Sequence, residues 1–179
     1  NWEGNPAYAN EYQMCRILKA YMFQNMTDLY GDVPYSEAGQ GYSTNPIPYP
    51  KYDTQEAIYK DLLKELDEAQ AALSTSDGNT IGDADVIYNG VAGKWKKFAN
   101  SLMLRVAMRL TKVAPDKAKT WVAKAVSNGL FVSNDDNAIV RHTNGSPSDD
   151  SAEPYGKVFS SLDTQAFYIN ETFINILQD

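Results

Sequence analysis

Four stretches of the chain carry apolar residues at the spacing of an α-helix. In the first stretch, apolar residues recur every three or four positions, which is the repeat of one helix face. These residues are Cys15, Leu18, Met22, Met26 and Leu29. We therefore predict a helix from about Ala7 to Leu29 that buries this face, with Cys15 as a buried, unreactive thiol.

A second helix is predicted from a start signal followed by a regular apolar face. Asp53-Thr54-Gln55-Glu56 has the form of a capping box, with Asp53 as the N-cap and Glu56 reaching back. The helix continues to about Leu73. Its predicted buried face consists of Ile58, Leu62, Leu66, Ala69 and Leu73.

Two further helices follow a polar linker at 74–90. One runs from about Ala92 to Val113 and the other from Pro115 to about Ser127. Their predicted core residues are Trp95, Phe98, Leu102, Val106 and Leu110 in the former, and Trp121, Val122, Ala125 and Val126 in the latter. Short extended pieces at 130–132 and 138–141 and a weak last helix from Phe167 to Gln178 complete the prediction. The pattern favours a mostly α fold of antiparallel helix pairs joined by long loops.

A turn ends the first helix and gathers three carboxylates. Gly31 stands where a helix needs a residue of positive φ, and Pro34 prevents continuation. Asp28, Asp32 and Glu37 lie around this turn and would be the candidates if the protein were a glycan-degrading enzyme with two catalytic carboxylates. We favour a structural role, in which Asp32 accepts backbone N–H bonds in the turn and Asp28 pairs with an Arg or Lys.

Three blocks of the sequence resemble the SusD/RagB family of nutrient-binding outer-membrane lipoproteins. They are YMFQNMTDLYGDVPYSEA at 21–38, YDTQEAIYKDLLKELDEA at 52–69 and KWKKFANSLMLRVAMRL at 94–110. The resemblance implies a tetratricopeptide-like α-helical fold, with residues 1–179 as one SusD-like domain and an internal fragment of a longer chain. It implies no catalysis and no cofactor.

The resemblance also implies a role and a location. The protein would sit on the cell surface, lipid-anchored in the outer membrane, with the anchor outside this fragment. There it would capture an oligosaccharide or another nutrient for a SusC-like TonB-dependent transporter. The alternatives are a helical glycan-degrading enzyme and a helical-repeat scaffold for protein partners.

Charge and composition argue against nucleic acid and metal ions as ligands. The net charge of −7 argues against nucleic acid, whose phosphates require basic patches. Asp77, Asp83 and Asp85 lack the spacing of a calcium loop, and we expect a solvated loop there. The single histidine, His142, has no second ligand at a metal-binding spacing, so no metal site is predicted.

The loop at 39–52 contains the residues that we expect to contact a ligand. Tyr42, Tyr49 and Tyr52 lie in a proline-stiffened segment with no helical face to join, and Gln40 and Asn45 could add hydrogen bonds. No charge occurs between Gly39 and Pro50, which suits a neutral ligand. The alternatives are that these rings pack on the first two helices as a lid, or that they face the transporter.

One cationic helix face is a second place where a ligand could bind. Arg105, Arg109 and Lys112 share a face of the third helix. We expect that face to be solvated or salt-bridged. A site for a sugar acid or a phosphate is the alternative.

Overall fold

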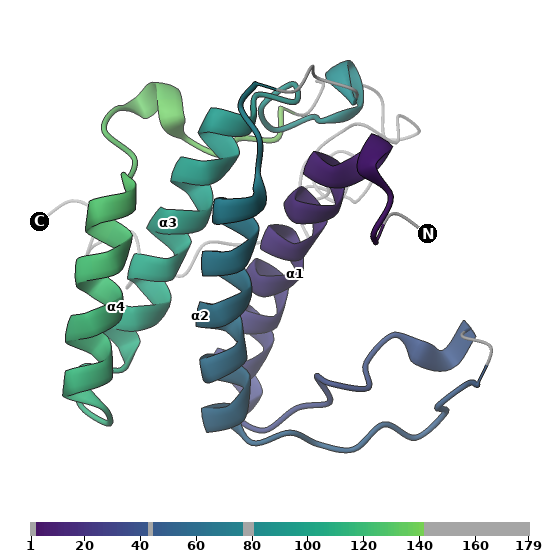
Figure 1. The fold of residues 1–179 in the computed structure, drawn as a ribbon. Coiled ribbons are helices and arrows are strands. Elements are labelled where there is room, and N and C mark those ends of the chain that lie inside the picture. Colours follow the sequence, from purple (N-terminus) through teal and green to yellow (C-terminus); the bar gives the residue numbers. More distant parts are fainter. Residues whose placement is uncertain (1–2, 43–44, 77–80, 142–179) are drawn as a thin grey trace, which may run out of the picture. The chain divides into compact units, whose positions relative to one another are not determined.

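Four α-helices make up most of the protein in the computed structural model, which describes residues 3–42, 45–76 and 81–141. They are α1 (Ala9–Tyr30), α2 (Gln55–Ala72), α3 (Ala92–Arg109) and α4 (Pro115–Asn128), and they match the four predicted helices (Figure 1). Within the described residues, β-structure is limited to one isolated bridge between Val33 and Asp53. The mostly α class is therefore confirmed.

The chain divides into two compact units. The first spans residues 1–139 and holds all four helices, whereas the second spans 140–179 and includes only two described residues. The predicted helix at 167–178, His142 and Asp77 lie outside the described residues. The predicted extended pieces at 130–132 and 138–141 are not strands in the structure.

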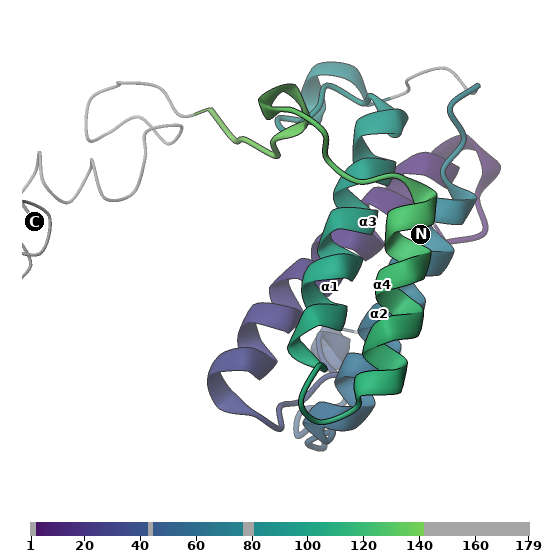
Figure 2. The same cartoon turned by 90° about the vertical axis from the view of Figure 1, so that its left-hand side faces the viewer.

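Consecutive helices run in opposite directions and pack on one another. α1 packs on α2, α2 on α3 and α3 on α4, while α1 and α3 touch less extensively (Figures 1 and 2). This arrangement confirms the antiparallel helix pairs. Among the described helices, none is both long and apolar enough to cross a membrane.

The core forms where α2 and α3 lie between their neighbours. All five residues predicted for the buried face of α2 are buried. In α3, Trp95 is only 2% exposed and Leu102 and Val106 are buried, while Phe98 and Leu110 are partly buried against the same core. In α4, Ala125 is buried but Val126 faces solvent, so that part of the prediction was wrong.

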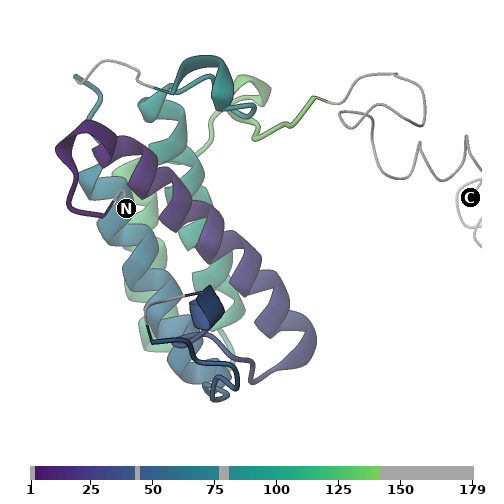
Figure 3. The same ribbon diagram turned by 90° about the vertical axis from the view of Figure 1, so that its right-hand side faces the viewer.

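The prediction for α1 chose the wrong face. Met22 is 64% exposed, Leu29 is 77% exposed, and Met26 and Cys15 also face solvent. The buried positions of α1 are instead Glu11, Met14, Ile17, Ala20, Gln24 and Thr27. These too recur every three or four residues, but half of them are polar, so hydrophobicity alone selected the other stripe. Figure 3 views the bundle from the side on which α1 crosses in front of the other helices.

A buried carboxylate organises the entry to α3, contrary to the expected solvated loop. Asp85 Oδ1 accepts the backbone N–H of Ile87 at 3.0 Å, and Oδ2 accepts that of Gly90 at 2.8 Å. The indole N–H of Trp95 also donates to Oδ2, at 2.7 Å. Asp85 is therefore a structural hub, because it satisfies turn donors and fixes the largest core ring. Among the described residues, no group of acidic, His or Cys side chains is suited to hold a metal ion.

Candidate functional site

The turn after α1 is fixed by its own backbone and one threonine. The Gly31 N–H donates to the Thr27 carbonyl at 2.8 Å, and the Thr27 hydroxyl donates back to the Gly31 carbonyl at 2.6 Å. Gly31 has φ +74°, as predicted, but its ψ of −120° lies outside the left-handed helical region. That combination belongs to the first central position of a type II′ turn, which is a glycine position.

Asp32 and Asp53 tie this turn to the start of α2. The Asp32 carboxylate accepts the backbone N–H of Gln55, the first residue of α2, at 2.8 Å. Asp53 accepts the N–H groups of Tyr35 at 3.2 Å and Ser36 at 2.7 Å. The bonds from Ser36 hold the pKa of Asp53 below its usual range.

Two sequence-based assignments change here. Asp53 is not the N-cap of α2, because Thr54 takes that role and its hydroxyl accepts the Ala57 N–H at 3.3 Å. Asp32 accepts a backbone N–H as predicted, but that N–H belongs to α2 and not to the turn itself. Both carboxylates thus join segments on either side of the loop.

Asp28 connects three helices. Its carboxylate accepts the hydroxyl of Tyr59 from α2, pairs with Arg109 Nε of α3 at 2.9 Å, and accepts the Gln24 amide of α1 at 2.7 Å. Burial raises the pKa of the Tyr59 hydroxyl, and the adjacent Asp28 charge adds to the effect. The predicted pairing of Asp28 with an arginine is confirmed.

Glu37, the third carboxylate near the turn, connects the beginning of the loop to its end at Lys51. It accepts the backbone N–H of Lys51 at 3.0 Å and lies 3.6 Å from the Lys51 ammonium. Each of the three carboxylates considered for catalysis therefore has identified structural partners.

The loop between α1 and α2 places two of the three candidate tyrosines in solvent. Tyr49 is 91% exposed and Tyr52 is 72% exposed, so neither ring packs down as a lid on the helices. In Figure 1 the loop extends away from the ends of α1 and α2. Tyr42 lies in the short 3-10 helix η2 (Gln40–Tyr42), but its side chain is outside the described part of the structure.

The two polar candidates also belong to this loop. The Gln40 side-chain amide donates to the Ser36 carbonyl at 3.3 Å, its backbone carbonyl accepts the Ile47 N–H at 3.3 Å, and Asn45 is exposed. The structure thus places Tyr49, Tyr52 and Asn45 on an open surface.

A cleft of about 750 Å³ opens at the same end of the bundle as this loop. The start of α2, the end of α3, the following turn and the start of α4 form its walls. Its lining comprises Gln55, Glu56, Tyr59, Lys60, Leu63, Arg109, Leu110, Val113, Ala114, Lys117 and Trp121. We call this set the bundle-end cleft. The combination of apolar, aromatic and charged lining residues is typical of small-molecule sites.

Sequence reasoning missed the bundle-end cleft because its walls come from three separate helices. One signal was available, since Asp28 and Asp32 belong to the block at 21–38. Asp32 binds the backbone of Gln55, and Asp28 holds Tyr59 and Arg109, which are all lining residues. This block therefore helps to build the wall of the cleft.

Positive charge predominates in the bundle-end cleft. Lys60, Arg109 and Lys117 are cationic, and Glu56 is the one acidic residue of the lining. Lys60 pairs with Glu56 at 2.6 Å, and this contact lowers the pKa of Glu56. Among the described residues, Lys117 forms no ion pair.

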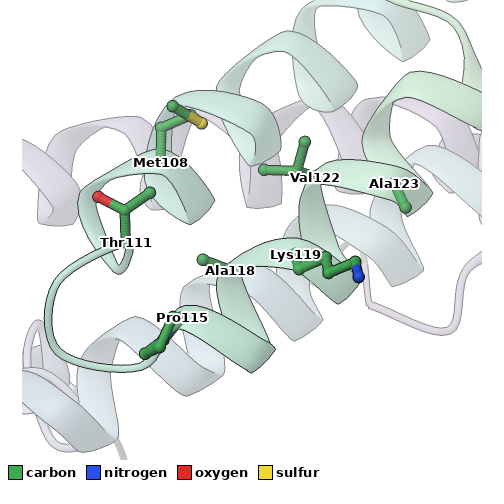
Figure 4. Close-up of a pocket in the computed structure, with 7 residues that line it drawn as sticks. All are labelled: Met108, Thr111, Pro115, Ala118, Lys119, Val122 and Ala123. Carbon is green, nitrogen blue, oxygen red and sulfur yellow. The ribbon is translucent and has the colours of Figure 1, made fainter.

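A second pocket, of about 370 Å³, lies between the end of α3 and α4 (Figure 4). Met108, Thr111, Pro115, Ala118, Lys119, Val122 and Ala123 line it. It offers no aromatic ring and no carboxylate or amide side chain. It is therefore less suited than the bundle-end cleft to a ligand that needs both stacking and hydrogen bonds.

Comparison with known proteins agrees with the helical fold. The SusD-like family model described as "Starch-binding associating with outer membrane" matches residues 2–179. No curated protein matches the chain at a significant level.

Solved structures are similar over most of the chain. A chitin-binding protein has 43% identity and a TM-score of 0.71, with 79% of this chain and 29% of that protein covered. A chitin-binding SusD homolog from Flavobacterium johnsoniae has 36% identity and a TM-score of 0.67, with 75% of this chain and 28% of that protein covered. A protein from Bacteroides vulgatus, whose description names the outer membrane and nutrient binding, has 30% identity and a TM-score of 0.72, with 86% of this chain and 33% of that protein covered.

The chain therefore spans between 28% and 33% of the length of these three proteins. The family match nevertheless extends over almost all of its own residues. Together with the helical structure, this match shows that the chain belongs to the SusD-like family.

Proposed function

We propose that the protein captures a saccharide at the surface of the outer membrane and passes it, without cleaving it, to a TonB-dependent transporter of the SusC type. The observation that carries the proposal is the family match over residues 2–179, reinforced by 43% and 36% identity to two chitin-binding proteins. A lipid anchor outside this chain would hold the protein at the membrane.

Within this function, the loop at 39–52 is the proposed contact surface for a neutral part of the ligand. Sugars present flat C–H faces that stack on exposed rings, and Tyr49 and Tyr52 are both exposed. Tyr42, Gln40 and Asn45 complete the proposed set. Holding the loop ends through Glu37 and Asp53 reduces the entropy that binding must remove.

The loop is tested by titrating the full-length protein with chito-oligosaccharides before and after Tyr49→Ala and Tyr42→Ala. We expect each variant to weaken binding and to leave the melting temperature unchanged. Tyr30→Ala is a matched control, since Tyr30 is also exposed but lies at the end of α1. Unchanged affinity in both loop variants would remove the loop as the site.

The transporter partnership needs a separate experiment. Affinity purification of the full-length protein from outer membranes of its own cells should bring a TonB-dependent barrel with it in a stoichiometric complex. Recovery of the protein alone after gentle detergent extraction would contradict the partnership. That result would not bear on the proposed saccharide binding, which is tested separately.

A further inference from the structure

We propose that the bundle-end cleft binds an acidic sugar residue, one that carries a carboxylate or sulfate group, within a longer saccharide. This inference rests on the proposed function, because it names the class of glycan that the protein captures. It assigns the cleft a role distinct from that of the tyrosine loop.

The apolar residues that line the bundle-end cleft suit the ring of a sugar. Trp121 contributes aromatic surface, and Leu110 and the exposed Val113 add aliphatic surface. The buried Tyr59 and Leu63 also line the cleft but present little surface of their own. Aromatic side chains that combine an apolar body with a polar tip are well matched to a ligand with apolar faces and polar edges. At about 750 Å³ the cleft is within the range of sites that hold small ligands.

The charge of the rim selects for an anion. Three cations line the cleft against one carboxylate, although the whole chain has a net charge of −7. Glu56 and Asp28 are already paired with Lys60 and Arg109. Among the described residues Lys117 forms no ion pair, and the carboxylate on which its charge acts, Glu56, is already bonded to Lys60. An anionic group can therefore approach Lys117 without breaking an ion pair.

The walls are held before any ligand arrives. Asp28 fixes Tyr59 and Arg109, and the Asp32 carboxylate holds the first N–H of α2 at Gln55. The Gln55 amide is in turn bonded to the Thr27 carbonyl at 2.6 Å. Such bonds between elements limit the ordering that binding requires, which favours affinity and selectivity.

The cleft and the tyrosine loop are close along the chain. Tyr52 is exposed and lies three residues before Gln55, which lines the cleft. The loop carries no charge between Gly39 and Pro50, whereas the cleft rim is cationic. A saccharide that alternates neutral and acidic residues would match both surfaces.

The test is calorimetric titration of the full-length protein with three hexasaccharides: neutral chitohexaose, carboxylate-bearing hexagalacturonate and a sulfated galactan hexasaccharide. We expect an acidic saccharide to bind more tightly than chitohexaose, and its affinity to fall as salt is raised. The tighter of the two acidic ligands identifies the acidic group. Lys117→Gln should weaken acidic binding by about threefold to fivefold, as for one exposed ion pair, and leave chitohexaose unaffected.

Two further variants make the test independent of folding defects. Val113→Glu adds a negative charge to the cleft at a highly exposed position and should also weaken acidic binding. Lys119→Gln is the matched control, because Lys119 lies on the same helix but lines the other pocket (Figure 4). It should leave both affinities unchanged.

The outcomes separate this inference from the proposed function. Binding of chitohexaose alone, or equal effects of Lys117→Gln and Lys119→Gln, overturns the acidic-sugar site and leaves saccharide capture standing. Failure of all three hexasaccharides to bind also overturns the acidic-sugar site. Saccharide capture itself is then decided by a wider glycan panel.

Discussion

At the residue scale, Gly31 shows how one backbone angle changes the expected effect of a substitution. Its positive φ could be anticipated from its place after a helix, but its ψ of −120° could not. Asparagine is tolerated in the left-handed helical region. Gly31 lies outside that region at ψ −120°, so asparagine has little advantage over other non-glycine residues there. No heavy atom lies within 4 Å of a Cβ built at Gly31, so the cost of a side chain there comes from the backbone alone.

We therefore expect Gly31→Ala to reduce the free energy of unfolding by about 1–3 kcal/mol, the range for a strained non-glycine conformation. Gly31→Asn should lose at least as much as Ala, and Gly31→Val more. Gly93→Ala is the control, because Gly93 lies in α3 without positive φ and also has open space around it. It should be neutral or stabilise by up to about 1 kcal/mol in urea melts. Equal losses at both glycines would contradict the assigned turn.

Substitution of Asp28 should also lower the stability of the protein by a measurable amount. Removing its carboxylate leaves the Tyr59 hydroxyl and the Gln24 amide without their acceptor, so Asp28→Ala should cost about 1–3 kcal/mol of unfolding free energy. Asp67→Ala removes only the exposed pair with Lys124 and should cost less than about 1 kcal/mol. Chemical denaturation of both variants gives the two losses of unfolding free energy. A loss at Asp28 no larger than that at Asp67 would refute its role as a connector of three helices.

At the scale of elements, α2 and α3 could be predicted in detail and α1 could not. The two inner helices have one apolar stripe each, so periodicity identified the buried face. α1 has two stripes, and the one that packs on α2 includes two polar residues, Gln24 and Thr27. The Thr27 hydroxyl donates to the Gly31 carbonyl and the Gln24 side-chain N–H donates to Asp28, whereas the Gln24 side-chain oxygen has no partner among the described residues. A polar residue that satisfies its hydrogen bonds locally can be buried at low cost, and no scale of hydrophobicity reports that.

The orientation of α1 can be measured with a matched pair of substitutions in the 1–179 chain. Ile17 is fully buried, and Ile17→Ala should cost about 2–5 kcal/mol of unfolding free energy. Met22 is exposed, and Met22→Ala should change stability by no more than about 0.5 kcal/mol. Thermal or urea melts give both values. The reverse order would show that the stripe first predicted is the buried one.

At the scale of the whole molecule, the family and helical class followed from sequence blocks at 21–38, 52–69 and 94–110, and the family match and structure agree with them. The bundle-end cleft did not follow, because its lining residues lie between 55 and 121 and only packing brings them together. The structural roles of Asp28 and Asp32 were predicted in kind, but their exact partners on α2 and α3 were not. Side-chain partners across helices depend on packing angles that periodicity does not contain.

We propose above that the protein captures saccharides without breaking them. The most direct measurement is titration of the full-length protein against a broad panel of neutral and acidic oligosaccharides, with chromatographic analysis of each mixture after prolonged incubation. We expect saturable binding to at least one saccharide and recovery of that saccharide intact. Binding to no member of the panel, or release of shorter products that Asp32→Asn or Glu37→Gln abolishes, would contradict it.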